Sequence, residues 1–473
     1  MIAAILVVVA STVVWWWRRA PEGFLVELRA VDGGALVFWR YNPNRGDSRE
    51  WVARFDTAGK LDWRRELPGL TSSRASLVIG DVVSVRYTRE SEHGVEQAVV
   101  AYGLGDGHLM WNTVLTSDAK SRSDLDVLTP FLQVFSAGGN LIEQVIERGE
   151  PLTHVLYTLQ PSSGQILGHT PINTDMEPRD PLILGDRLIL HDIGAHVNVV
   201  DTSHGAAVTA LHTSDVGVAT GCVVGDDYIT VADEGDLALV AFHQGDPASR
   251  RVLAKPFYAK NGVFIVRSCG RHADRLVFVI VEDLLRGHDS KTSIVLTDLN
   301  GTVLASIAMP FSTPWASETS MRSPDVRAFS GSLPRFVPYL NGDDTKEHDL
   351  HLYLAMVDLE QARIAWVASK PLELSDAIFH VGDRWYLNNS VTGGDLVEFD
   401  GATGQLIAAI HGGKALEPEH VAGGMLWLHR HSWGRLDRAE LAAVDPKTLV
   451  PLFARGIEIT DITKQARDRL GVP

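Results

Sequence analysis

The sequence predicts an all-β protein, a single β-propeller of eight or nine four-stranded antiparallel blades, preceded by an N-terminal transmembrane helix. Three observations lead to this prediction: a strand–turn–strand motif repeated along most of the chain, a tight glycine turn upstream of most copies, and one uncharged apolar run at the N-terminus. Tandem four-stranded units are typical of propellers, in which each blade packs against its neighbours.

The N-terminal run extends from Ile2 to Trp17 without a charge and is followed by Arg18 and Arg19. As a helix it spans roughly 24 Å, and flanking arginines and tryptophans extend that reach towards a hydrocarbon core of about 30 Å. It lacks the basic n-region and small-residue cleavage site of a secretory signal. We therefore expect an uncleaved anchor over residues 1–20; a cleaved signal and a buried strand are the alternatives.

The repeated motif is an apolar strand that ends in Asp or a substitute, followed by a turn with Gly and another strand. An Asp at this point accepts hydrogen bonds from N–H groups of the turn, and glycine supplies a positive φ. Six of the nine positions are Asp, which is more than scattered turns would give. The nine positions are Asp56, Gly103, Gln160, Asp201, His243, Asp298, Asp358, Asp400 and Asp445.

A two-residue turn precedes the motif in most units, as at Gly33-Gly34, Gly80-Asp81 and Gly139-Asn140, and joins two apolar strands. Each unit thus reads strand, tight turn, strand, variable loop, strand, Asp/Gly turn, strand. A string of β-sandwiches would need linkers that are not visible, and a parallel β-helix has a shorter period. We place the propeller at 21–455 and a tail at 456–473, with a short helix from Asp461 to Leu470.

These motifs resemble the quinoprotein-like (PQQ-like) propeller repeat, and the likeness covers roughly residues 22–455. In that family the tryptophan of the motif packs between neighbouring blades. Most units here lack it, so the resemblance implies a diverged, non-enzymatic member. The residues that match the motif are Asp56, Gly59, Trp63, Trp111, Asp201, Asp298, Asp358, Trp366, Asp400, Gly404 and Asp445.

The family includes two kinds of protein. Some are dehydrogenases that use pyrroloquinoline quinone, and others are non-enzymatic scaffolds of outer-membrane assembly. The resemblance implies a vicinal cysteine pair and Ca²⁺ ligands for the dehydrogenases, whereas Cys222 and Cys269 stand 47 residues apart and no Ca²⁺ set can be assigned. We therefore predict no cofactor. Both cysteines fall in the first strand of consecutive units, so we expect them on adjacent inner strands, as buried thiols rather than a disulfide.

Histidine and acidic clusters give weaker candidates for a site. His429 and His431 share one strand face and could hold a metal if a third ligand were present, but exposed strand histidines are the plainer interpretation. The loop at 341–349 is rich in oxygen ligands without the spacing of a calcium loop. No catalytic, cofactor-binding or metal-binding residue is assigned, because no nucleophile elbow or phosphate-loop motif occurs either.

Composition and charge narrow the function. The 473 residues are 45% apolar and carry a formal net charge of −16, which disfavours nucleic-acid partners. We expect a non-catalytic, membrane-anchored scaffold or protein-binding module of a cell-envelope assembly, with protein partners there. We place its propeller on the extracytoplasmic (periplasmic) side, with the cytoplasmic side as the alternative orientation. A diverged quinoprotein-type enzyme and a ligand-sensing ectodomain are the alternative functions.

Overall fold

The computed structural model describes most of the propeller and the start of the tail. The described residues are 23–41, 48–71, 75–92, 94–119, 134–147, 153–172, 182–191, 197–203, 207–211, 221–233, 237–254, 263–283, 290–313, 332–344, 350–368, 372–373, 377–381, 384–389, 395–412, 416–422, 424–430, 433–434 and 440–470.

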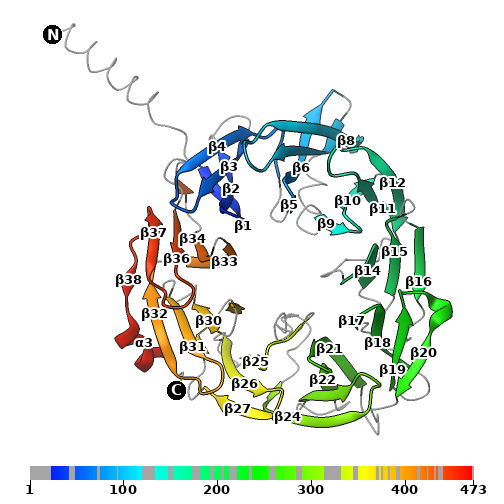
Figure 1. Ribbon diagram of the computed structural model, residues 1–473, viewed down its shortest axis with the longest axis vertical. Helices are drawn as coiled ribbons and strands as arrows, with labels where there is room; N and C mark the ends of the chain where they lie inside the picture. Colours follow the sequence, from blue (N-terminus) through cyan, green and yellow to red (C-terminus); the bar gives the residue numbers. More distant parts are fainter. Residues whose placement is uncertain are drawn as a thin grey trace.

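These residues form nine antiparallel sheets that follow one another around a closed ring, so the chain is an all-β propeller of nine blades (Figure 1). Each blade uses strands that are consecutive in sequence, with the first strand at the centre of the ring and the last at its outside. The first unit, residues 24–67, forms a complete blade, which is why the count is nine rather than eight.

The first three blades contain β1 (Gly23–Val31), β2 (Gly34–Tyr41), β3 (Arg49–Asp56) and β4 (Leu61–Glu66); β5 (Ser76–Ile79), β6 (Val82–Ser91), β7 (Gly94–Gly103) and β8 (Leu109–Ala119); and β9 (Val134–Ala137), β10 (Asn140–Glu147), β11 (Thr153–Leu159) and β12 (Ile166–Ile172). The next three contain β13 (Leu182–Leu184), β14 (Arg187–His191), β15 (Val197–Asp201) and β16 (Ala207–Leu211); β17 (Gly221–Val224), β18 (Asp227–Asp233), β19 (Leu237–His243) and β20 (Arg251–Ala254), with the 3₁₀ turn η2 (Pro247–Ser249); and β21 (Val263–His272), β22 (Arg275–Asp283), β23 (Ser290–Asp298) and β24 (Val303–Thr313).

The last three blades contain β25 (Phe336–Asp344), β26 (Leu350–Asp358), β27 (Arg363–Val367) and β28 (Leu372–Glu373); β29 (Ala377–Val381), β30 (Arg384–Asn389), β31 (Asp395–Asp400) and β32 (Leu406–His411); and β33 (Leu416–Ala422), β34 (Met425–Arg430), β36 (Leu441–Val444) and β37 (Pro451–Arg455). In the seventh blade, β27 and β28 pair one after the other with the same strand, β26.

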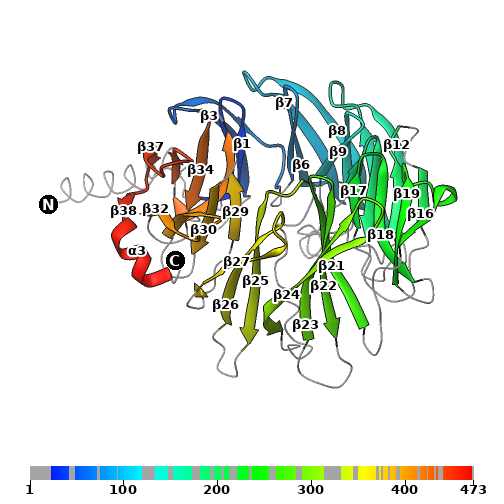
Figure 2. The same cartoon turned by 60° about the horizontal axis from the view of Figure 1, so that its bottom comes forward.

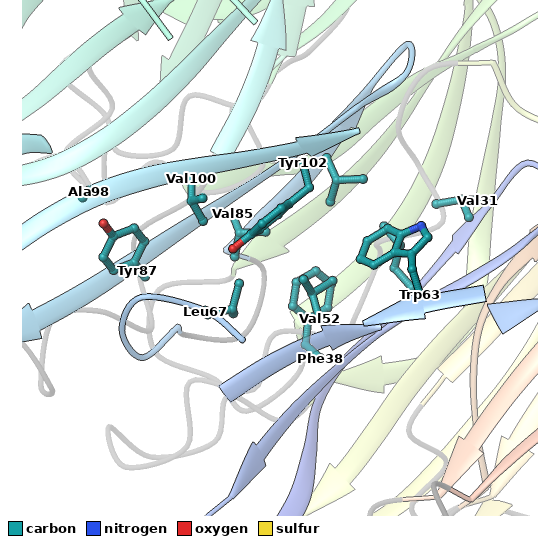
Figure 3. Packing of buried hydrophobic residues seen from close by; sticks show 12 residues of the cluster. Val31, Phe38, Val52, Trp63, Leu67, Val85, Tyr87, Ala98, Val100 and Tyr102 are labelled. Carbon is teal, nitrogen blue, oxygen red and sulfur yellow. The ribbon is translucent and has the colours of Figure 1, made fainter. Parts of the chain in front are cut away.

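The core lies between the blades rather than in one central cluster. Each of the nine interfaces between neighbouring blades holds its own group of buried apolar side chains. Between blades 1 and 2, Phe38, Val52 and Trp63 face Val85 and Tyr102 (Figure 3). This arrangement follows from strands that are buried on both faces and therefore carry near-continuous apolar runs.

The tight turns after the first strands confirm the hairpin prediction with small corrections. The turn residues are Asp32-Gly33 and Gly138-Gly139, one position before the predicted ones, while Gly80-Asp81 is as predicted. In the sixth blade Ala273 takes the left-handed position with φ of 52°, which is why no glycine marked this turn in the sequence.

The ring closes between blade 9 and blade 1. The pairing of the N-terminal strand β1 with the last blade is limited to two residues of β35 (Trp433–Gly434), a short strand in the loop between β34 and β36. Most of the closure is apolar, with Trp427 and Met425 packed against Val37 and Phe55.

The tail returns to blade 8. After β37, the strand β38 (Thr460–Asp461) pairs antiparallel with the outer strand β32, and the helix α3 (Thr463–Leu470) lies on the outside of the same blade (Figure 2). The helix begins two residues after the predicted start, and Asp461 accepts hydrogen bonds from the amide and hydroxyl of Thr463 at 2.9 and 2.6 Å.

The run predicted to anchor the chain, residues 1–20, lies outside the described residues. Within the part of the chain that the structure describes, no helix has the length and apolar character needed to cross a bilayer.

Candidate functional site

The aspartates of the repeat motif hold the turns between the third and fourth strands. The Oδ1 atom of Asp56 accepts hydrogen bonds from the amides of Ala58 at 2.9 Å and Lys60 at 2.8 Å. The carboxylates are thus engaged by their own turns, which gives them a structural role. Equivalent bonds to turn amides occur at Asp201, Asp298, Asp358, Asp400 and Asp445, and Gly404 takes a positive φ as Gly59 does.

The tryptophans of the motif join one blade to the next. Trp63 of blade 1 donates from Nε1 to the carbonyl of Leu104 in the Asp-type turn of blade 2, at 3.0 Å. A Cβ atom on Gly107 of that turn would lie 2.5 Å from the Trp63 ring, so only glycine allows this approach. The tryptophan therefore packs on the glycine turn of the next unit, and we call this contact between two blades a joint.

The same joint recurs at two other interfaces. Trp111 donates to the carbonyl of Pro161 at 2.7 Å and its ring covers Gly164, while Trp366 donates to the carbonyl of Gly401 at 2.9 Å. Each bond runs from the fourth strand of one blade to the turn of the next. This is the inter-blade packing that the resemblance implied for the tryptophan.

At the ring closure the joint uses a phenylalanine that sequence reasoning missed. Phe453 of β37 covers Gly59 in the turn of blade 1, as Trp63 covers Gly107. The guanidinium of Arg455 lies 5.5 Å from the centre of the Phe55 ring across the same interface. The signal was present, because Phe453 stands at the tryptophan position of the last unit.

One aspartate of the motif is buried and forms an ion pair with a partly exposed arginine. Asp358 is 2% exposed and accepts two hydrogen bonds from Arg335, at 3.1 and 2.8 Å. Burial alone would raise the pKa of Asp358, but the bonds from Arg335 and from two turn amides outweigh it, so the pKa lies below its ordinary value.

Two charged residues, Arg86 and Glu143, are buried between blades 2 and 3 and were not predicted. Arg86 is 2% exposed and donates to the carbonyl of Gln144 at 3.0 Å, while Glu143 is 0% exposed. Neither carboxyl oxygen of Glu143 has a hydrogen-bond partner within the described residues. Burial raises the pKa of Glu143 to about 8, although the charge of Arg86 acts against it.

The histidine candidates do not form a site in the described residues. His429 is 3% exposed and lies on the strand face that Trp427 presents to blade 1, so the expectation of exposed strand histidines is wrong for His429. His431 lies outside the described residues, as does most of the loop at 341–349. No group of three His, Cys, Asp or Glu side chains within the described ranges could hold a metal ion.

The cysteines lie where the repeat register placed them. Cys222 is in β17 and Cys269 in β21, the innermost strands of blades 5 and 6, and both thiols are free and buried. The prediction of two buried thiols on adjacent inner strands is confirmed.

Apolar side chains are exposed on the outer strands at a recurring position. We call these the outer apolar residues; they follow the Asp-type turn directly and so lie at the same end of each blade. Leu109 is 61% and Leu452 58% exposed, which is high for leucine. In the four consecutive blades 9, 1, 2 and 3 these residues are Val450, Leu452, Leu61, Leu109, Ile166 and Leu167, and in blades 5 and 6 they are Val252, Val303 and Leu304.

Blade 8 shows what covers such a position. Leu406 stands where Leu61 stands in blade 1, yet it is only 2% exposed and belongs to a cluster that includes Ala466 of α3. On the same strand, Ile410 and His411 pair with β38, and Thr463 exchanges hydrogen bonds with the backbone of Ala409. An added strand and a helix from the chain's own tail therefore cover the outer edge of this blade.

The fold defines a nine-bladed β-propeller in which an aromatic ring of one blade contacts the turn of the next blade at four interfaces. Neither a protein-family model nor any curated protein matches the sequence.

Solved structures give distant matches, all of low similarity. BamB from Moraxella catarrhalis is 10% identical over 86% of this chain and 91% of its own, with a TM-score of 0.40. Quinohemoprotein alcohol dehydrogenase from Comamonas testosteroni is 11% identical over 82% and 74%, with a TM-score of 0.41, and the computationally designed Ika8 protein is 10% identical over 84% and 98%, with a TM-score of 0.38. At this distance the matches carry no argument about function.

Proposed function

We propose that this protein is a non-catalytic propeller scaffold that binds protein partners in a cell-envelope assembly, held at the membrane by its N-terminal run and facing the extracytoplasmic side. The observation that carries the proposal is the row of outer apolar residues on consecutive blades. Exposed apolar side chains that recur on one surface favour contact with a partner protein over contact with solvent alone.

The mode of binding follows from blade 8. An outer strand has unpaired backbone groups that can accept a further strand, and its apolar residues can accept the apolar side chains of a partner. The tail of this chain already covers blade 8 in that way. A partner segment of extended chain followed by an apolar helix would cover the outer edges of blades 9, 1, 2 and 3 by the same contacts.

The experiment compares matched variants of the full-length protein isolated from detergent-solubilised membranes. Leu109→Glu and Leu452→Glu place a charge at the outer apolar residues, and Thr209→Glu places one on the outer strand of blade 4, where the exposed residue is a threonine. We expect the amount of a co-purifying partner protein to fall at least tenfold in the two leucine variants, with an unchanged Tm. The Thr209→Glu variant should retain the wild-type amount of that partner.

Equal co-purification with all three variants would contradict the proposed surface. A protein that purifies alone and turns over a substrate or binds a small ligand would favour the alternatives, a diverged quinoprotein-type enzyme or a ligand-sensing ectodomain.

A further inference from the structure

Two buried cysteines lie at the interface between blades 5 and 6. Cys222 pairs with Ile229 in its sheet and Cys269 with Phe278 in the next, and the inner strands β17 and β21 that carry them lie side by side. Cys222 and Cys269 belong to the same buried cluster at this interface. The side chains are 2% and 3% exposed.

The surroundings of the pair are apolar. Ile229, Leu239 and Leu276 belong to the same buried cluster. Burial raises the pKa of the Cys269 thiol well above its ordinary value, and the neighbouring Cys222 raises it further. In the folded protein the Cys269 thiol is therefore neutral, and both side chains are shielded from solvent, so neither is accessible to an outside reagent.

We propose that Cys222 and Cys269 are a modification site, an oxidisable pair that forms a disulfide between blades 5 and 6 while the chain folds. The oxidant is a low-molecular-weight disulfide. One protein thiolate attacks it, forming a mixed disulfide and releasing one small thiolate; the second protein thiolate then attacks the mixed disulfide and releases the other. Two S–H bonds are lost, one S–S bond forms, and the two electrons and two protons end on the two released thiols.

The position of the two cysteines and their separation in sequence mean that this bond would stabilise the folded state. The two cysteines lie in one buried cluster on neighbouring inner strands, so the fold brings their side chains to the same place before any bond forms. The bond would close a loop of 47 residues that includes the rest of blade 5, and loops of this length stabilise the folded state by restricting the unfolded chain. It would form in an oxidising compartment and not in a reducing one.

The test refolds the full-length protein from denaturant with reduced and oxidised glutathione, and in parallel with dithiothreitol. Free thiols are then blocked in denaturant with N-ethylmaleimide, and the product is analysed by mass spectrometry. We expect the glutathione sample to carry no label, to have lost two hydrogen atoms, and to yield one peptide pair joined through Cys222 and Cys269. Its Tm should exceed that of the reduced sample by on the order of 5 °C.

The variants Cys222→Ala and Cys269→Ala provide matched controls, because each leaves one thiol that cannot form the bond. Both should show the same Tm under the two conditions. Two labelled thiols, or glutathione adducts in place of the cross-link, in correctly folded wild-type protein would overturn the proposal. If refolding from denaturant is inefficient, protein expressed in an oxidising compartment and blocked at lysis gives the same two readouts.

Discussion

Glu143 is a buried carboxyl whose charge state controls the stability of one blade interface. Its pKa is about 8 in the folded protein and near 4.5 when the chain is unfolded. The folded state thus prefers the protonated form. The stability from this group is fully present below about pH 4.5 and is lost as the pH rises to about 8.

We therefore expect Glu143→Gln to have little effect on Tm at pH 4.5 and to raise it by several degrees at pH 9, because the amide never has to carry a charge in the interface. Thermal unfolding of both proteins between pH 4.5 and 9 measures this. Glu458→Gln, at an exposed position, serves as the control. A Glu143→Gln variant that loses stability with pH as steeply as the wild type would contradict the interpretation.

Sequence periodicity missed this pair for a physical reason. The second strands of the units read as apolar runs, and a charged residue within one of them, such as Arg86 in VVSVRYTRES, is taken for a solvent-facing position. In a propeller both faces of the strand are buried against neighbouring blades. A charged side chain there must meet its partner from the next blade, and that neighbour is not visible in a one-dimensional pattern.

At the scale of the elements, the joint between Trp63 and Gly107 links two blades through a large ring and a missing side chain. Trp63→Ala removes a buried ring and a hydrogen bond and should cost about 3–5 kcal/mol of unfolding free energy. Gly107→Ala should also destabilise, because its Cβ would meet the ring and its φ is +67°.

The double variant separates these effects. Once the Trp63 ring is gone, the alanine at 107 no longer collides with it and keeps only the backbone strain, so the two losses should be less than additive by at least about 1 kcal/mol. Denaturant unfolding of the four proteins gives the coupling energy. Strict additivity would mean that the ring and the glycine do not interact.

The tail covers blade 8 through one small buried residue. Ala466→Glu would place a carboxylate in the apolar cluster and should release α3 and β38 from the blade. Limited proteolysis should then cleave the tail at least tenfold faster, while Lys464→Glu on the exposed side of the same helix should leave it protected. Equal protection of both variants would show that the helix does not need this contact.

The strands could be predicted from sequence where the residues of a turn themselves stabilise that turn. Eight of the nine Asp-type positions lie at the end of the third strand of their blade or directly after it, and Asp358 ends β26 in blade 7, because the carboxylate and the glycine act within the turn itself. Ala273 and Phe453 were not predicted. Ala273 takes the left-handed turn position that glycine usually occupies, and Phe453 takes the position that tryptophan usually occupies, so the geometry is kept with a different residue.

At the scale of the whole molecule, we expect the propeller to fold independently of the predicted anchor. The run Ile2–Trp17 was predicted to hold the chain at the membrane, and the propeller begins after it. A protein starting at Pro21 should remain folded and stay in the supernatant after a carbonate wash, whereas the full chain should pellet with the membranes. Pelleting of both proteins would contradict the predicted anchor.

The central claim is that the outer apolar residues are a protein-binding surface, and site-specific photo-crosslinking in intact cells tests it most directly. A photoreactive amino acid at Leu109 should give one discrete cross-linked protein, and the same residue at Thr209 should give none. No cross-link at Leu109, Leu452 or Ile166, or equal cross-linking at Thr209, would contradict the claim.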